Sequence, residues 1–211
     1  MAHVTDARVQ SRYAGDPESA QWAASLIQHR QTILPKRLVE PGPDVSQLEL
    51  IFAAAAAAPD HGELVPWRFV VIPAGARGRL AAVFAASLLE RDPCATAQQV
   101  EQAREKAFRA PVLMLAVVDA GSPGGEIPAT ERILSAGCAI QNMLLVATSQ
   151  GFGSALTGGK ALHSRGLRAL FSLRACEQAV CFVSIGTAQR RKPPRQRPEP
   201  SRYISFLSPP G

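Results

Sequence analysis

The segment Thr130–Gln150 constrains the fold most, because it predicts a long helix with apolar residues on almost every side. These residues are Ala136, Cys138, Ala139, Ile140, Met143, Leu144, Leu145, Val146 and Ala147. A helix without a polar face must be covered all round, either in a core or at a subunit interface. Small residues such as Gly137 would permit close helix packing, and Gly151 predicts a C-cap.

Two other segments predict buried strands. The runs 111–119 (PVLMLAVVD) and 179–186 (AVCFVSIG) are almost continuously apolar, which is typical of strands covered on both faces. A proline-bounded run at 66–73 predicts a third strand. Amphipathic patterns predict further helices at 17–30, 44–59 (capped by Asp44 or Ser46), 77–90, 95–108 and 164–171. This mixture predicts an α+β fold over residues 17–189, preceded by a flexible lead-in at 1–16.

The net charge of +6 is concentrated at one end of the sequence. Residues 190–211 form a proline-rich basic tail, in which six cations and one acid between Arg190 and Arg202 carry +5. Binding of nucleic acid would require a basic face on folded structure or a recognisable module. We therefore expect no nucleic-acid partner, and interpret the tail as solvated or as an arm that contacts phosphate or another subunit.

Several other classes of protein are disfavoured. No apolar run reaches the roughly 18 residues of a membrane helix, and the N-terminus lacks the apolar stretch of a secretory signal. A cytoplasmic protein without a membrane partner is therefore expected. The four cysteines form no CxxC pair and are expected to be free thiols, mostly in the core. The histidines are too scattered to predict a metal site.

The segment 151–159 is rich in glycine and is predicted to be a loop. It is no dinucleotide fingerprint, because Leu156 stands where the third glycine belongs, and no phosphate-binding P-loop, because Ser154 replaces the first glycine. Glycines 153, 158 and 159 lack a Cβ, so their backbone N–H groups could approach a ligand closely. The alternative is that these glycines serve only a helix end and a turn. His61 lies just past the end of the helix predicted at 44–59, beside a glycine and a proline. It is either a functional residue or simply a solvated residue of this loop.

Five motifs, in the same order, resemble the nitroreductase family. The first is Arg30-Gln31-Thr32, where the family has RRS or RRT, and the second runs from Ala58-Pro59-Asp60-His61 to Pro66-Trp67-Arg68-Phe69. Arg109-Ala110-Pro111 precedes a strand as the family's RAP does. The fourth motif comprises the beginning and the end of the long helix, residues 135–142 and 150–154. The fifth is the strand exit Ile185-Gly186-Thr187.

This resemblance implies a nitroreductase-like fold, with a central mixed sheet flanked by helices, and a homodimer whose interface contains the long helix. It also implies FMN bound between the subunits, NAD(P)H as reductant, and a small-molecule acceptor such as a nitroaromatic, quinone or activated enone. The implied FMN-binding residues are Arg30, Gln31, Thr32, Ala57, His61, Leu156, Thr157 and Gly158. No side chain is required as a catalytic acid or base, because the flavin carries out the chemistry, although His61 could donate a proton.

Two departures from the family pattern affect the implied FMN site. Gln31 replaces the second arginine, and Leu156-Thr157 replaces a Trp-Arg pair, so positive charge and a stacking surface are lost. Either Lys36, Arg37 or the basic tail holds the phosphate, or FMN binds less tightly. The alternative function is a flavin-binding or sensing protein of the same fold without turnover.

Overall fold

The computed structural model describes residues 16–122, 124–191, 193 and 196–207. Most of the expected lead-in, residues 1–15, and parts of the basic tail therefore lie outside the described residues. Asp16 is the N-cap of the first described helix, α2 (Pro17–His29), and its carboxylate accepts a hydrogen bond from the Ser19 N–H at 3.0 Å. None of the helices in the described part of the chain has the length and apolarity needed to cross a membrane.

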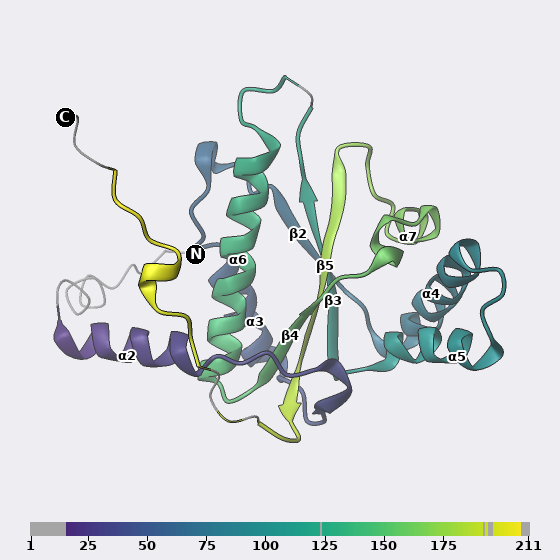
Figure 1. The fold of residues 1–211 in the computed structure, drawn as a ribbon, viewed down its shortest axis with the longest axis horizontal. Coiled ribbons are helices and arrows are strands. Elements are labelled where there is room, and N and C mark those ends of the chain that lie inside the picture. The colour runs from purple at the N-terminus through teal and green to yellow at the C-terminus, as the bar shows by residue number, and fades with distance from the viewer. Residues whose placement is uncertain (1–15, 123, 192, 194–195, 208–211) are drawn as a thin grey trace.

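A five-stranded sheet forms the centre of the molecule (Figure 1). Its strands are β1 (Leu38–Val39), β2 (Trp67–Val71), β3 (Val112–Asp119), β4 (Gly153–Thr157) and β5 (Glu177–Ala188). The order is β1-β5-β3-β2, and β4 pairs with β5. The predicted α+β architecture is confirmed. Each of these strand pairs is antiparallel, so the parallel pairing of the expected mixed sheet is limited, among the described residues, to the single bridge between Thr32 and Ser154.

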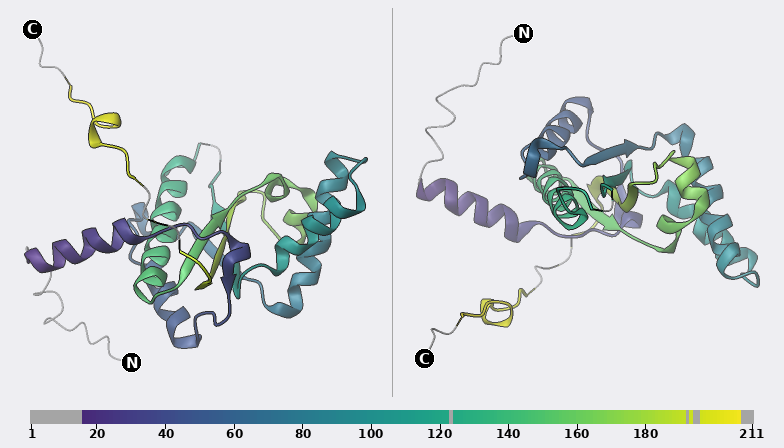
Figure 2. Two further views of the ribbon diagram at one scale, coloured as in Figure 1. Left: turned by 60° about the horizontal axis from the view of Figure 1, so that its bottom comes forward. Right: turned by 90° about the horizontal axis from the view of Figure 1, so that it is seen from above.

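Helices cover both faces of this sheet (Figures 1 and 2). The α-helices are α2 (Pro17–His29), α3 (Val45–Ala55), α4 (Arg77–Arg91), α5 (Ala97–Glu105), α6 (Ala129–Ser149) and α7 (Arg165–Leu170). On one face α3 and α6 bury a core around Met114, Met143 and Val183. On the other face α4 and α7 pack over Leu115 and Phe182. Since neighbouring residues of β3 enter different cores, this strand is buried on both faces, as its sequence predicts.

The helix ends follow the predicted capping residues. Asp44 caps α3 through a capping box, in which its carboxylate accepts from the Gln47 N–H at 2.8 Å and the Gln47 side chain accepts from the Asp44 N–H at 3.0 Å. At the end of α6, Gly151 has a φ of +88°. The Phe152 N–H donates to the Ala147 carbonyl at 2.9 Å, as in a Schellman motif. The predicted C-cap is therefore confirmed.

One face of helix α6 is buried within the single chain, whereas Leu134 on the opposite face is 68% exposed. Cover of that face by a second subunit stays a prediction. The predicted glycine-rich loop is wrong between Gly153 and Thr157, which form strand β4 against β5. Gly153 is needed there for packing, since a Cβ would lie 2.8 Å from the Leu38 side chain. Its missing side chain therefore makes room for the core and not for a ligand.

A candidate ligand cavity lined by positive charges

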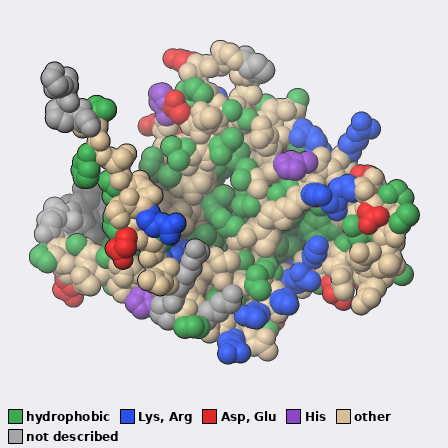
Figure 3. All heavy atoms as spheres, in the orientation of Figure 1, with side chains coloured by type: hydrophobic (Ala, Val, Ile, Leu, Met, Phe, Trp, Pro, Cys, Tyr) green, Lys and Arg blue, Asp and Glu red, His purple; other side chains and the backbone are tan. Residues whose placement is uncertain are grey.

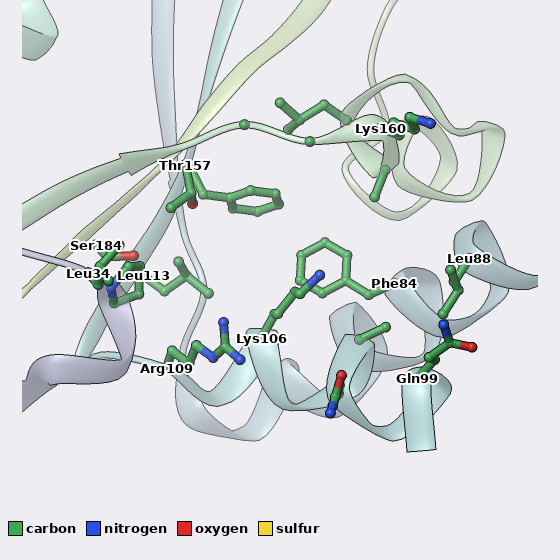
Figure 4. Close-up of a pocket in the computed structure, with 18 of the residues that line it drawn as sticks. Leu34, Phe84, Leu88, Gln99, Lys106, Arg109, Leu113, Thr157, Lys160 and Ser184 are labelled. Carbon is green, nitrogen blue, oxygen red and sulfur yellow. The ribbon is translucent and has the colours of Figure 1, made fainter. Parts of the chain in front are cut away.

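A cavity of about 740 Å³ lies between the α4–α5 pair and the edge of the sheet at β4 and β5 (Figure 4). Its size is within the roughly 300–1,000 Å³ typical of small-molecule sites. The segment between β4 and the short 3₁₀ helix η5 (Lys160–His163) forms one wall, and α4, α5 and the 3₁₀ helix η4 (Lys106–Phe108) form the opposite wall. Apolar side chains, including Phe84 and Leu88, supply much of the lining.

The charged side chains of this lining are all positive. They are Arg91, Lys106, Arg109 and Lys160, and no Asp or Glu among the described residues lines the cavity. None of the four forms an ion pair with the described residues. Lys and Arg side chains also gather on this side of the surface (Figure 3). A concave site with charges of one sign and apolar walls concentrates the electrostatic potential, so this cavity favours an anionic ligand.

Three features of the cavity walls also suit a ligand. The Ser184 hydroxyl is 1% exposed and makes no hydrogen bond to the described residues. Leaving a buried hydroxyl unpaired costs about 1–3 kcal/mol, which a ligand atom would relieve. The rings of Phe84 and Phe182 meet edge to face, with centroids 5.5 Å apart. Gly158 and Gly159 line the cavity. Of the three glycines that could let a ligand approach the backbone closely, these two are therefore the ones placed to do so.

The predicted cofactor residues of β4 are divided between its two faces. Thr157 and Gly158 line the cavity, whereas Leu156, which is 43% exposed, does not. The segment Arg30–Thr32 runs along the edge of β4, where Thr32 bridges to Ser154. This segment is not part of the lining, but the chain enters the cavity at Leu34. The four residue-to-residue steps from Arg30 to Leu34 span at most about 14 Å, so the two places lie within reach of one extended ligand.

Arg30 has a second arginine beside it. Nη2 of Arg197, in the basic tail, donates to the carbonyl oxygens of Gln28 at 3.4 Å and Arg30 at 3.2 Å. Burial and, to a lesser extent, the positive charge of Arg197 lower the pKa of the Arg30 guanidinium. Neither arginine forms an ion pair with the described residues. Around Arg197 the tail therefore contacts the end of α2 and the residue that follows it. Next to Arg30, the side chain of Gln31 has a buried Oε1 without a hydrogen-bond partner among the described residues.

Ala57 and His61 lie elsewhere, on the side of the sheet covered by α3 and α6. Nδ1 of His61 lies 2.8 Å from Oε2 of Glu131 in the first turn of α6, and both side chains are largely exposed. The surrounding loop is strained, since φ is +52° at Glu63 and +44° at Val65. The predicted site residues therefore form two groups, one near the cavity and one at this loop, and a single chain does not bring them together.

The sequence patterns do not indicate Arg91 or Lys106 as lining residues, they identify Arg109 only within a motif, and they point to the basic tail without singling out Arg197. Lys106 and Arg109 are three residues apart at the end of a helical segment, a spacing that places side chains on one face. That spacing was the available signal for two neighbouring cations, but it carries no information about which face lines a cavity. The position of Arg197 depends on how the tail returns to α2, which the sequence pattern does not indicate.

The sheet with helices on both faces and the cation-lined cavity define an α+β protein with a candidate site for an anionic ligand. The chain belongs to the nitroreductase family, since it matches the family model described as "Nitroreductase family" over residues 27–187. It is 34% identical over 189 residues to "Putative NAD(P)H nitroreductase YdjA" of Escherichia coli K12, a match that covers 88% of this chain and 99% of that protein.

Solved structures support the same fold. The nitroreductase-like family protein from Bacillus cereus superposes with a TM-score of 0.76 at 16% identity, covering 87% of this chain and 95% of that one. A structure described as a mutant of the FMN and NADPH-dependent nitroreductase NfnB, from Sphigopyxis sp. strain HMH, superposes with a TM-score of 0.69 at 18% identity, covering 88% and 99%. At these identities the likeness establishes the fold alone, and the nitroreductase-like architecture predicted from the motifs is confirmed.

Proposed function

We propose that this chain is an FMN-dependent NAD(P)H oxidoreductase that reduces nitroaromatic, quinone or related electrophilic acceptors by two-electron ping-pong transfer. Membership of the nitroreductase family and a relative named as an NAD(P)H nitroreductase support an oxidoreductase. The NfnB structure is described as FMN and NADPH-dependent, which supports flavin as the cofactor. The observation that carries the proposal is the large cavity lined by four cations and, among the described residues, no carboxylate.

The residues present fit FMN. Its phosphate is a dianion, and Arg30 with Arg197 would offer it two guanidinium groups that have no ion-pair partner among the described residues. Arginine suits this role because its planar fork donates two parallel hydrogen bonds to an oxyanion. In this arrangement Arg197 supplies the positive charge that is lost at Gln31. The cavity would take the ring, with Lys106, Thr157 and Ser184 as its polar contacts.

Two-electron redox chemistry is what the flavin supplies when it is bound. The chain's residues would hold and orient the reactants, and the apolar walls at Phe84 and Phe182 would exclude water. No carboxylate or imidazole of the described residues of one chain lines its own cavity, so within a single subunit we propose no catalytic acid or base there. Lys106 and Arg109 would instead stabilise negative charge in the cavity by Coulomb attraction, which is stronger in such a poorly solvated place than in water.

A homodimer would reunite the two groups of predicted residues. The face of α6 that contains Leu134, together with the half-buried Cys138 and Leu145, is incompletely covered in the single chain, which suits a subunit interface. The loop with His61 lies next to the N-terminal turn of the same helix. We propose that each subunit's His61 loop covers the cavity of the other subunit, where His61 donates a proton to the acceptor.

The absorbance spectrum of the purified protein, followed by stopped-flow reduction, tests this function. We expect a visible flavin spectrum, as purified or after FMN is added, which is bleached by NADPH or NADH and restored by a nitroaromatic or a quinone. A colourless protein that leaves the FMN spectrum unchanged would contradict the proposal. Bound FMN that neither nicotinamide reduces would instead favour the flavin-binding protein without turnover.

A further inference from the structure

The cavity has two ends with different surroundings (Figure 4). At one end Arg109 lies near Leu34, Leu113 and Ser184. At the other end Leu88 and Gln99 form part of the wall, and Lys160 lies on the wall across from Leu88. Arg91 follows Leu88 by three residues on α4, so its side chain lies on the same helical face as Leu88 and also lines the cavity.

The two cations of this second end, Arg91 and Lys160, make no ion pair with the described residues. Nε of Arg91 donates to the Ser87 carbonyl of its own helix at 2.8 Å, and its terminal nitrogens make no hydrogen bond to the described residues. Lys160 is exposed and forms no ion pair with the described residues. Two like charges facing one cavity repel each other, and a bound anion would remove that repulsion.

The proposed phosphate site at Arg30 and Arg197 leaves Arg91 and Lys160 without a ligand group of their own. Between these two cations and the sheet the lining is apolar and partly aromatic, with Phe84, Leu88 and Leu162. Such a surface packs against a planar ring, while the cations attract a group of negative charge.

We propose that Arg91 and Lys160 form an anion subsite that selects substrates carrying a carboxylate or phosphate group. The subsite favours planar aromatic acceptors with a carboxylate over their neutral counterparts. A phosphate group of the nicotinamide donor is a second source of the same chemistry. The selection of substrates during turnover rests on the proposed function. The binding of an anion to Arg91 and Lys160 depends neither on flavin nor on turnover.

The first experiment measures binding alone. Fluorine NMR titrations of the purified protein, with and without added FMN, compare 4-fluorobenzoate with the neutral 4-fluorobenzamide. We expect the carboxylate to bind about tenfold more tightly or better, the ratio expected of one charge-assisted hydrogen bond. The variants Arg91→Gln and Lys160→Gln should each reduce this ratio severalfold. Arg79→Gln, an equal charge change at an exposed residue of α4 outside the cavity lining, should leave the ratio unchanged.

Equal binding of the two compounds, or an equal loss in Arg79→Gln, would overturn the subsite. The second experiment compares kcat/KM for 4-nitrobenzoate and 4-nitrobenzamide, and for NADPH and NADH. A carboxylate preference that disappears in Arg91→Gln assigns the subsite to the acceptor. If Arg91→Gln instead abolishes a preference for NADPH over NADH, and the two acceptors react alike, the subsite is assigned to the 2′-phosphate of NADPH. If no acceptor is reduced but the binding ratio and its loss in the variants remain, the proposed function fails and the subsite stands.

Discussion

The cation-lined cavity and the ion pairs at the start of β5 both contain cationic side chains, but only the ion pairs include carboxylates. Glu177 is 3% exposed and accepts hydrogen bonds from Nε of Arg68 at 2.8 Å and from the backbone N–H of Arg174 at 2.9 Å. Arg174 also pairs with Asp119 at 3.0 Å. In the cavity, by contrast, no carboxylate of the described residues faces the four cations. In these two regions the compensated charge serves the fold, whereas the uncompensated charge of the cavity is available to a ligand.

Removing the buried carboxylate should have the largest effect on stability. Glu177→Ala removes the charge-assisted hydrogen bonds that this buried carboxylate accepts from Arg68 and Arg174, a loss on the order of 3 kcal/mol. Urea unfolding followed by circular dichroism measures this loss. The control Glu49→Ala removes an exposed carboxylate of α3 and should change the unfolding free energy by less than about 0.5 kcal/mol. An equal loss of unfolding free energy in the two variants would contradict the claim that the Glu177 ion pairs stabilise the fold.

The same carboxylate should make stability depend on pH. Hydrogen bonds, first from Arg68 and then from Arg174, outweigh burial and lower the pKa of Glu177 from 4.5 to about 2. A lowered pKa stabilises the fold fully above the unfolded value, and this contribution is lost as the pH falls from about 4.5 through 2. The loss should be roughly 3 kcal/mol. The difference in unfolding free energy between the wild type and Glu177→Gln should narrow over this range, and a constant difference would contradict the assignment.

Replacing the tail arginine tests the proposed phosphate site. Arg197→Gln should weaken FMN binding about tenfold to a hundredfold, because one charge-assisted hydrogen-bond donor is lost. Riboflavin, which has no phosphate, should bind the variant as it binds the wild type. Quenching of flavin fluorescence measures both affinities. Arg202→Gln, an equal charge change farther along the tail, serves as control, and an equal loss of FMN and riboflavin affinity would argue against a contact with phosphate.

A cavity cation should matter least for stability. Lys106→Gln removes a charge that has no ion-pair partner among the described residues and lies near other cations. The unfolding free energy of the flavin-free protein should therefore stay within about 0.5 kcal/mol of the wild type, or rise slightly. Thermal unfolding at low ionic strength detects either result. A loss above about 1 kcal/mol would mean that Lys106 holds the fold together, as Glu177 does.

Much of the fold could be predicted because its signals are local. The continuous apolar run of β3 and the Asp44 cap of α3 can be read without knowing any tertiary contact. Strand β4 could not be predicted, since Gly153 and Ser154 look like turn residues in sequence. The packing of Ile33 and Leu38 against Gly153 places this segment beside β5, and such a contact between distant parts of the chain has no local pattern.

The site was less predictable than the fold. Thr157 and Gly158 do line the cavity, but their assignment came from motifs, and the motifs gave no reason to separate them from His61. Lys106 and Lys160 come from elements more than fifty residues apart and meet only through the fold. Likewise, no local pattern indicates that Leu134 of α6 is left exposed in the single chain. Sequence patterns report periodicity and capping well, whereas the convergence of charges is a property of tertiary structure.

The most direct test of the central claim is a crystal structure of the protein grown with FMN. We predict flavin density in the cavity, with the ring beside Thr157 and Lys106 and the phosphate between Arg30 and Arg197. A ring bound outside this cavity, or a phosphate that contacts neither arginine, would contradict the account that the uncompensated cations mark the cofactor site.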